Sequence, residues 1–267
     1  MHNTHYTCLS EFVCFVLCDN FQSVMSHFEI LSDSGVRCDG RKPSEIRSVK
    51  CKLGVFDQAD GSAYFEVGNT RVLAAVYGPH EISESNKGKS AHDRALINCQ
   101  YSMATFSTSE RKSRPRGDYR SMEINAYLCE IFESAVITEL YPHSQIDIYL
   151  EVLQADGSNY SACVNAASLA LVHAGIPIKD IVCSCSAGYF SGVTLVDLNH
   201  SEESVNAIPT ISIALLPKSK QTLSIESSGR INVNSLEKLM ESVTDGCHQI
   251  LAIMKSVISN HIKELNV

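Results

Sequence analysis

The stretch QIDIYLEVLQADGSNY, residues 145–160, decides the fold. Every second residue of its first part is apolar, namely Ile146, Ile148, Leu150 and Val152. This period of two is typical of a strand with one buried face. A glycine turn at 156–158 follows, and the chain from 160 to 174 is then rich in alanine up to Gly175. The second pattern predicts a buried helix with a glycine stop, so we predict an α+β fold whose two sheet-plus-helix halves join near residue 155.

Short β-branched or aromatic runs lie on both sides of this junction, and glycine or proline separates many of them. Such runs predict strands joined by turns. Before the junction the predicted strands are 46–53, 62–67, 70–77, 95–103 and 145–153, and after it they are 181–189, 193–198, 210–216 and 221–226. Gly68-Asn69, between the second and third strands, predicts a two-residue hairpin.

Three helices complete the predicted fold, at 119–140, at 160–174 and from 234 to near the C-terminus. Asn234 is the predicted cap of the last helix, because its side chain can accept from a free backbone amide and Glu237 follows three residues later. That helix carries an apolar stripe of Leu236, Leu239, Met240, Val243, Cys247, Ile250, Leu251, Met254, Val257, Ile258 and Ile262. Such stripes face a core more often than a partner, so we expect this one to face the core.

The predicted domain organisation has three parts. Residues 25–155 form the first half, and residues 156–267 form the second half with its long C-terminal helix. Residues 1–24 are expected to be a disordered or artefactual extension, with Met25 as the working start. Their apolar run, 12–18, is far shorter than the roughly 20 residues that span a bilayer. No lysine or arginine precedes the run, so it does not resemble a signal peptide.

The composition is that of an ordinary globular protein. Of 267 residues, 44% are hydrophobic, and 14 glycines with 7 prolines are too few for a collagen-like or linker-rich chain. With 22 Lys and Arg against 30 Asp and Glu, the net charge of −8 argues against a protein that coats nucleic acid through its overall field. Any contact with RNA or DNA must therefore be local.

The cysteines and histidines predict neither a zinc site nor a disulfide framework. Eleven cysteines is an odd number and contains no C-x2-C pair, and the ten histidines contain no H-x-x-x-H pair. Disulfide frameworks belong mainly to small secreted chains. We expect reduced intracellular thiols that are mostly buried as small hydrophobic groups.

Three segments carry residues suited to chemistry. Residues 111–120, RKSRPRGDYR, hold five basic residues in ten and are either a phosphate-binding track or a solvated loop. The glycine turn at 153–160 offers backbone amides to an anion at the start of a helix, although many such turns bind nothing. Residues 197–203 place acids at the end of a strand, where carboxylates can hold Mg²⁺ or simply form a polar turn.

A series of short motifs runs through the chain in a specific order. They are Ser32-Asp33-Ser34-Gly35, Arg37, Asp39-Gly40-Arg41, Gly61-Ser62-Ala63, Gly68-Asn69-Thr70, Val76-Tyr77-Gly78-Pro79, Ser121-Met122-Glu123-Ile124, Leu153-Gln154-Ala155-Asp156-Gly157, Ala174-Gly175-Ile176-Pro177 and Asp197-Leu198. In order and spacing they resemble the RNase PH family, from about Phe28 to the C-terminal helix. The resemblance implies an RNase PH fold, which has two βαβ-type halves of the ribosomal protein S5 domain 2-like kind.

The resemblance also implies a reaction. Catalytic members attack the terminal RNA phosphodiester with inorganic phosphate and release nucleoside diphosphates. Cations and backbone amides must offset the repulsion of the two anions. The catalytic positions implied here are Asp197 and Glu203, with Asp197 as the Mg²⁺ ligand if there is one. The implied phosphate-binding positions are Arg120, Ser158, Asn159 and Tyr160, and the basic residues expected to contact RNA along the ring's pore are Lys87, Lys89, Arg94, Arg111, Lys112, Arg114 and Arg116.

Two of these positions depart from the active pattern. Active members resemble Gly-Thr-Arg where this chain has Ser158-Asn159-Tyr160, and a phenol cannot replace a guanidinium. They also pair two aspartates six residues apart, whereas Asp197 here is matched by Glu203. We therefore expect a non-catalytic subunit of the RNA exosome ring. The alternatives are an active phosphorolytic exoribonuclease that uses Arg116 and Arg120, and a stand-alone RNA-binding module.

The resemblance further implies partners and a location. The expected partners are RNA, other RNase PH-like subunits in a six-membered ring, RNA-binding cap subunits and associated hydrolytic nucleases, with no membrane. No cofactor is expected, and Mg²⁺ and inorganic phosphate would be needed only by an active enzyme. The expected locations are the nucleus, the nucleolus and the cytoplasm.

Overall fold

The structure is a computed structural model that describes residues 30–32, 35–82, 88, 93–111, 118–204 and 208–265. The predicted extension, 1–24, lies outside these ranges. Contacts divide the chain into two compact units, Met1–Lys42 and Pro43–Val267. In the first unit, Leu31 and Arg37 form an isolated β-bridge, and the amide of Gly40 donates to the carbonyl of Arg37 at 2.9 Å. The sheets and helices described below all belong to the second unit.

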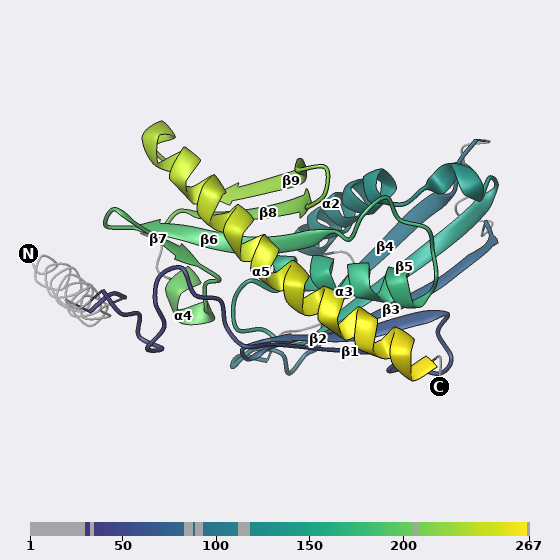
Figure 1. The fold of residues 1–267 in the computed structure, drawn as a ribbon, viewed down its shortest axis with the longest axis horizontal. Coiled ribbons are helices and arrows are strands. Elements are labelled where there is room, and N and C mark those ends of the chain that lie inside the picture. The colour runs from purple at the N-terminus through teal and green to yellow at the C-terminus, as the bar shows by residue number, and fades with distance from the viewer. Residues whose placement is uncertain are drawn as a thin grey trace, which may run out of the picture. The chain divides into compact units, whose positions relative to one another are not determined.

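The second unit contains two sheets (Figure 1). The first has the strand order β1-β2-β3-β5-β4 and consists of β1 (Val49–Leu53), β2 (Gly61–Val67), β3 (Thr70–Glu81), β4 (Leu96–Met103) and β5 (Ser144–Gln154). The second has the order β7-β6-β8-β9 and consists of β6 (Cys183–Phe190), β7 (Val193–Val196), β8 (Thr210–Leu216) and β9 (Gln221–Ser228). Only the pair β4 and β5 is parallel among these strands.

Five helical segments accompany the sheets in the described ranges: α2 (Tyr119–Ala135), the 3-10 turn η3 (Thr138–Leu140), α3 (Asn159–His173), α4 (His200–Glu203) and α5 (Val233–Leu265). The segment with α2 makes the crossover from β4 to its parallel neighbour β5. Helix α5 packs on β6, β7 and β8 and also reaches β1 (Figure 1). These elements confirm the predicted α+β class.

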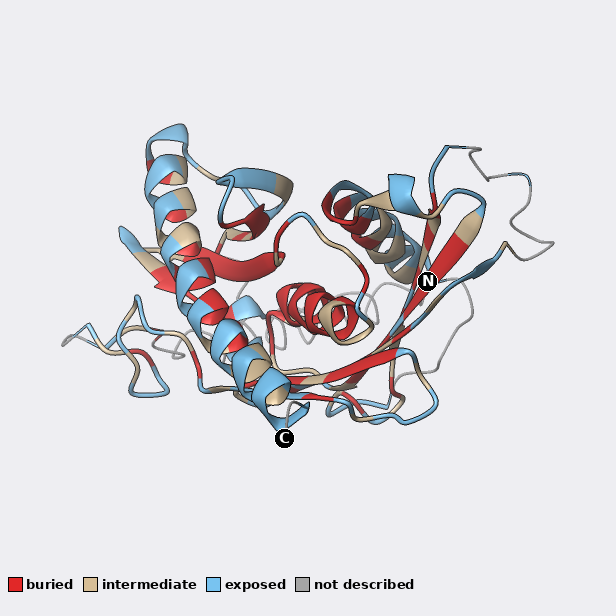
Figure 2. Cartoon of the chain, turned by 45° about the vertical axis from the view of Figure 1, so that its right-hand side comes forward, coloured by how far each residue is buried: buried red, intermediate tan, exposed pale blue. Residues whose placement is uncertain are grey.

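Helix α3 lies between the two sheets, which explains its alanine-rich sequence. Twelve of its fifteen residues are buried, and it packs on β2 and β3 on one side and on β6 on the other (Figure 2). Its small side chains permit close approach, since a Cβ added at Gly61 of β2 would collide with the carbonyl oxygen of Ala170. The helix ends at His173, and Gly175 follows two residues later with a φ of +70°, which favours glycine, and an amide that donates to the carbonyl of Val172. The predicted buried helix with a glycine stop is confirmed.

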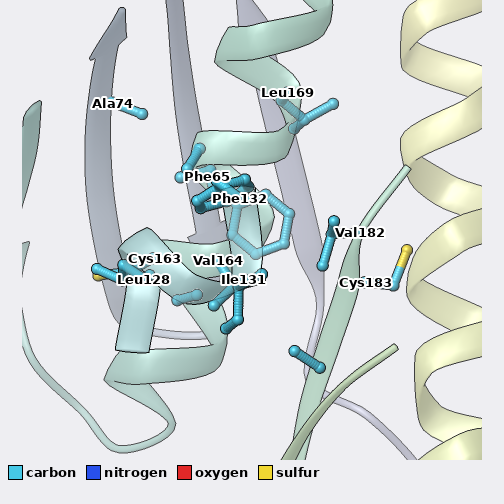
Figure 3. Packing of buried hydrophobic residues seen from close by; sticks show 14 of the residues in the cluster. Phe65, Ala74, Leu128, Ile131, Phe132, Cys163, Val164, Leu169, Val182 and Cys183 are labelled. Atoms are coloured by element: carbon cyan, nitrogen blue, oxygen red, sulfur yellow. The ribbon is translucent and has the colours of Figure 1, made fainter. Parts of the chain in front are cut away.

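The apolar side chains of the second unit form one continuous core. Figure 3 shows part of it, with Phe65 of β2, Phe132 of α2 and Leu169 of α3 in the same cluster. Helix α5 adds its stripe to this core, and at Gly246 it approaches so closely that an added Cβ would lie 2.9 Å from the sulfur of Cys185. The stripe predicted to face the core does so for most of its length, although Ile262 near its end is exposed.

All nine predicted strands occur in the described part of the chain, with ends that shift by a few residues. The hairpin at Gly68-Asn69 is confirmed, because Val67 pairs directly with Thr70. Strand β3 runs four residues past the predicted Tyr77, with a register shift between Tyr77 and His80.

The prediction that a helix continues from 119 to 140 is wrong, since α2 ends at Ala135. Val136 is extended and forms a β-bridge with Ile178, and the amide of Ile137 donates to the carbonyl of Pro177 at 3.0 Å. Tertiary pairing with a segment about forty residues away therefore overrides the helical periodicity.

The predicted cap of the last helix is also wrong. Helix α5 begins at Val233, and the carbonyl of Asn232 accepts from the amides of Ser235 and Leu236. The side chain of Asn232 accepts from the amide of Asn234 at 3.4 Å. Asn232, two residues earlier than predicted, therefore occupies the capping position.

The cysteines in the described residues carry free thiols: Cys38, Cys51, Cys99, Cys129, Cys163, Cys183, Cys185 and Cys247. Five of these eight are buried, as expected for small hydrophobic groups. Burial raises the pKa of Cys51 to about 11 and that of Cys183 to about 12, so both stay protonated near neutral pH. Within the described ranges, no helix has the length and apolar character needed to cross a membrane.

A pair of histidines joins the end of α3 to the end of α5. The Nδ1 atom of His173 accepts from the amide of Ser62 at 3.2 Å, and the ring centroids of His173 and His261 are 5.2 Å apart. Desolvation and the neighbouring His261 lower the pKa of His173. The native fold therefore favours neutral His173, because a proton on Nδ1 would remove the acceptor.

We expect the free energy of unfolding to fall as pH decreases through about 6.5, the ordinary histidine pKa. In that range the unfolded chain binds more protons than the folded chain, and stability then rises with pH. The loss should level off below the folded-state pKa of His173. For each protein, the urea midpoint of unfolding is measured at about pH 7.5 and at about pH 5.5. The difference between the two midpoints should be smaller in His173→Gln than in the wild type. His248→Gln, at an exposed position of α5, is the control, and equal differences in all three proteins would contradict the assignment.

Candidate functional site

The site forms where the turn between β5 and α3 meets the loop after β7. Gly157 in the turn has a φ of +81°, and an added Cβ would lie 2.5 Å from the carbonyl oxygen of Leu198 and 2.8 Å from the amide of His200. Only glycine fits this close approach. The structure thus brings together two segments that the sequence singled out, 153–160 and 197–203.

Arg47 holds these two segments with its guanidinium group. Its Nε and Nη2 atoms donate to the two carboxylate oxygens of Asp197 at 2.9 and 2.7 Å, and its backbone amide donates to the same carboxylate at 2.9 Å. The Nη1 atom donates to the carbonyl of Asp156 at 2.6 Å, and Nη2 lies 3.4 Å from that of Gly157. The side chains of Arg47 and Asp197 are only 7% and 5% exposed.

The electrostatics keep Arg47 charged. Desolvation lowers its pKa, but the hydrogen bonds and charge of Asp197, with smaller contributions from Asp156 and Glu203, raise the pKa overall. Sequence reasoning missed this residue, since a single arginine at the start of a predicted strand carries no signal of a partner 150 positions away. The ion pair is therefore a structural finding.

Glu203 binds the start of α3. Its Oε1 atom accepts from the amide of Ser158 at 2.7 Å. The residue keeps contact with solvent, yet the surrounding protein dehydrates its carboxylate and raises the pKa of Glu203, while Ser158, Arg47 and Arg120 partly oppose this. Ser158 is also occupied through its hydroxyl, which donates to the carbonyl of Leu198 at 3.0 Å and pairs with Ser186. The predicted anion-binding groups of Ser158 are thus engaged within the protein.

Tyr160 lies inside the fold and not on its surface. It is 8% exposed, and its hydroxyl donates to Ser224 of β9 at 3.3 Å. Burial raises the pKa of Tyr160 to about 12, so the phenol is neutral. Neighbouring Asn159 is half-buried, and its side-chain oxygen has no hydrogen-bond partner within the described residues.

Arg120 is exposed in the first turn of α2 and acts on the same region. Its charge lowers the pKa of Glu203 and of Glu226 on β9, where burial otherwise raises both. Among the predicted phosphate-binding residues, Arg120 is thus the one that supplies a positive charge near Glu203.

The predicted acids do not fit a Mg²⁺ centre as the structure places them. Both oxygens of Asp197 accept from Arg47, and one oxygen of Glu203 accepts from Ser158. Among the residues that the structure describes, no three His, Cys, Asp or Glu side chains are placed to share a cation.

The structure covers only part of the predicted RNA track. Arg94 and Arg111 are exposed, as a phosphate contact requires. The other predicted residues lie outside the described ranges: Lys87, Lys89, Lys112, Arg114 and Arg116.

Comparisons with known proteins agree on one family. The model of the 3′ exoribonuclease family, domain 1 (RNase PH) matches residues 45–177, and that of domain 2 of the same family matches residues 180–242. Exosome complex component RRP41 of Homo sapiens is 49% identical over 243 residues, which are 91% of this chain and 98% of the relative. Exosome component Rrp41 of Methanopyrus kandleri is 40% identical over 218 residues, or 82% of this chain and 90% of the relative.

Two solved structures share the fold. Rice Rrp46 superposes with a TM-score of 0.72 at 25% identity, over 83% of this chain and 100% of that chain. The Archaeoglobus fulgidus exosome with RNA bound to the active site gives a TM-score of 0.71 at 20% identity, over 82% of this chain and 92% of that chain. Together with the family models, these likenesses confirm the predicted RNase PH fold.

We expect Arg47→Ala to lower the free energy of unfolding by about 3–5 kcal/mol, because it leaves the buried charge of Asp197 without its partner. Arg47→Lys keeps the charge but not the paired donors, so it should lose less. Urea denaturation measures both. The control is Lys50→Ala, which removes a 72% exposed lysine 3.4 Å from Glu66 and should cost about 0–1 kcal/mol. Equal losses in Arg47→Ala and Lys50→Ala would contradict the assigned role.

Proposed function

The chain belongs to the RNase PH family of 3′ exoribonucleases, and we propose that it is an RRP41-type subunit of an RNA exosome ring that contributes to 3′ to 5′ RNA processing without catalysing phosphorolysis. Relatives named as this exosome component match at 40–50% identity over most of both chains. The main support for the proposed loss of activity is Tyr160. This buried neutral phenol lies at the position where the resemblance to active members implies an arginine.

The chemistry of phosphorolysis explains why this observation matters. Inorganic phosphate and the RNA phosphate must approach one another, and donors aimed at the developing charge make that possible. Losing one such donor typically lowers the rate by about 10²- to 10³-fold. Here the amide of Ser158 already donates to Glu203, and Tyr160 donates to Ser224. Both groups serve the protein interior instead of an incoming anion.

An active phosphorolytic enzyme is the second candidate, and Arg120 is the observation that favours it. This arginine is exposed and close enough to Glu203 to lower the pKa of that carboxyl. In this candidate Arg120 and Arg116 would hold the phosphate in place of the missing guanidinium. The first candidate is preferred because one solvated arginine is a weaker anchor than a site with several fixed donors.

Assembly with other subunits is supported by the open edges of both sheets. Strands β1 and β4 end the first sheet and β7 and β9 end the second, so each has one unpaired side within its sheet. Exposed apolar side chains lie on α2 and β9, among them Tyr119 at 81%, Met122 and Ile225. We propose that RNase PH-like neighbours in a six-membered ring cover such surfaces, with RNA-binding cap subunits and hydrolytic nucleases as further partners. The expected nuclear, nucleolar and cytoplasmic locations follow from this assignment alone.

The protein, co-expressed with an RNase PH-like partner, should release no nucleoside diphosphate from 3′-labelled RNA in the presence of phosphate. Tyr160→Arg should restore a trace of release, because it returns a cation to the site, whereas the matched variant Tyr160→Phe should not. Glu203→Gln is the better probe of the acids, since Asp197→Asn would also disturb the buried pair with Arg47. Phosphate-dependent trimming that Glu203→Gln abolishes would show an active enzyme and overturn the proposal.

Replacing Arg111, Lys112 and Arg114 by glutamate should weaken RNA binding to the assembled ring and flatten its salt dependence, by about 0.7 in log–log slope for each phosphate that is no longer neutralised. The effect should depend little on RNA sequence, because binding to the backbone carries no sequence information. Lys220, Lys238 and Lys255 are exposed outside the predicted track, and their replacement by glutamate is the charge-matched control. The same affinity and slope in both triple variants would show that the 111–120 segment is a solvated loop.

A further inference from the structure

A cleft of about 640 Å³ lies beside the site, where the start of β3 meets the end of β5. None of the predicted catalytic or phosphate-binding residues lines it. Its walls include Tyr64 and Arg71 from the first sheet, Phe106 and Ser107 from the segment after β4, and His200 from the start of α4. The volume falls in the range of about 300–1,000 Å³ that is usual for small-molecule sites.

The aromatic group at this cleft has little protein to pack against. Phe106 is 73% exposed, which is unusual for a large apolar side chain next to buried Ala104 and Ser107. The segment itself is well fixed, because the carbonyl of Ser107 accepts from the amide of Ala155 and its amide donates to Ala104. Phe106 therefore offers a flat apolar face from a backbone that is already held in place, which is the requirement for stacking on a base.

The charged groups at the cleft favour an anion. Arg71 has a 48% exposed side chain, and in the described part of the chain its one ion pair is a long contact of 3.9 Å between Nε and Glu66. Glu66 is already satisfied by the hydroxyl of Tyr64 at 2.8 Å and by Lys50 at 3.4 Å. His200 is exposed at the same cleft and adds a second nitrogen-bearing side chain.

Other groups of the protein partly balance the negative charge of Asp156, which lies in the wall of the cleft. The carboxylate of Asp156 accepts from the side chain of Asn69 at 3.0 Å and from the amide of His200 at 3.4 Å, and it lies 3.9 Å from Arg47. It therefore repels an anion less than a free carboxylate would. The hydroxyl of Ser107 is buried and has no hydrogen-bond partner among the described residues.

We propose that this cleft binds a ribonucleotide, with the base stacked on Phe106 and the phosphate held by Arg71 and His200. The nucleotide can come from an RNA strand that passes the subunit or from free nucleoside diphosphate, because both present the same base and phosphate chemistry. None of the residues implied for phosphorolysis lines this cleft, although Asp156 and His200 of the same two segments do, so this binding goes beyond the proposed function. It requires no phosphorolysis and no ring partner.

The test measures affinity of the full chain for two fluorescent probes, an ADP analogue and a six-nucleotide oligoadenylate. Phe106→Ala should weaken binding of the preferred probe by about 5- to 150-fold, the usual effect of removing the aromatic ring under one stacked base. Arg71→Ala should weaken it several-fold and reduce its salt dependence, because one phosphate is then no longer neutralised. Binding of ADP alone identifies a free nucleotide as the source, and binding of the oligonucleotide alone identifies an RNA strand.

Matched controls separate this cleft from other surfaces. Phe56→Ala removes another exposed phenylalanine and Lys52→Ala another exposed cation, and neither should change the affinity. Arg120→Ala tests whether either probe binds instead at the implied phosphate position. The proposal is overturned if neither probe binds the wild type, if Phe106→Ala and Arg71→Ala bind as tightly as their controls, or if only Arg120→Ala weakens binding. If the protein shows no phosphorolysis and passes this test, the cleft proposal is supported. If the protein catalyses phosphorolysis and fails this test, each result contradicts its own proposal, and neither decides the other.

Discussion

The buried ion pair between Arg47 and Asp197 is the interaction on which the site depends. Removing two charges from water is costly, and their attraction offsets the cost only when the geometry is good and the remaining donors are satisfied. Both conditions hold here, because Arg47 donates to both oxygens of Asp197 and to the carbonyl of Asp156. One side chain thus joins the segment before β1, the turn before α3 and the loop after β7. The junction therefore holds the turn and the loop of the site against one another.

At this junction, polar groups that could bind an anion form hydrogen bonds within the protein instead. Glu203 accepts from the amide at the start of α3, and the hydroxyl of Ser158 donates to Leu198. Each bond stabilises the turn, and each removes a donor or an acceptor from an incoming phosphate. The site is therefore held together by the residue types that, in the family's reaction, would contact substrate. Internal cohesion and ligand binding compete for the same atoms.

Much of the fold was predictable from the sequence, because strands with one buried face leave a period of two and a helix between two sheets leaves a run of small residues. The failures have physical causes. The end of α2 depends on pairing of Val136 with Ile178, which no local pattern encodes. The departure at Tyr160 was visible in the sequence, but its hydrogen bond to Ser224 was not, since Ser224 lies 64 residues away on β9. Arg47 was missed for the same reason: its partner lies 150 residues away.

The burial of Tyr160 explains why the departure from arginine suits this fold. The helix that carries Tyr160 is fixed between both sheets, so the side chain cannot move to the surface without disturbing the core. A guanidinium at this place needs a bound anion or a nearby carboxylate to offset its desolvation, and the candidate carboxylate is Glu226, whose pKa burial already raises. A phenol needs only one hydrogen-bond partner, which Ser224 supplies. If the subunit does not bind phosphate, as proposed, tyrosine is the less costly occupant, because the interior stays neutral when the site is empty.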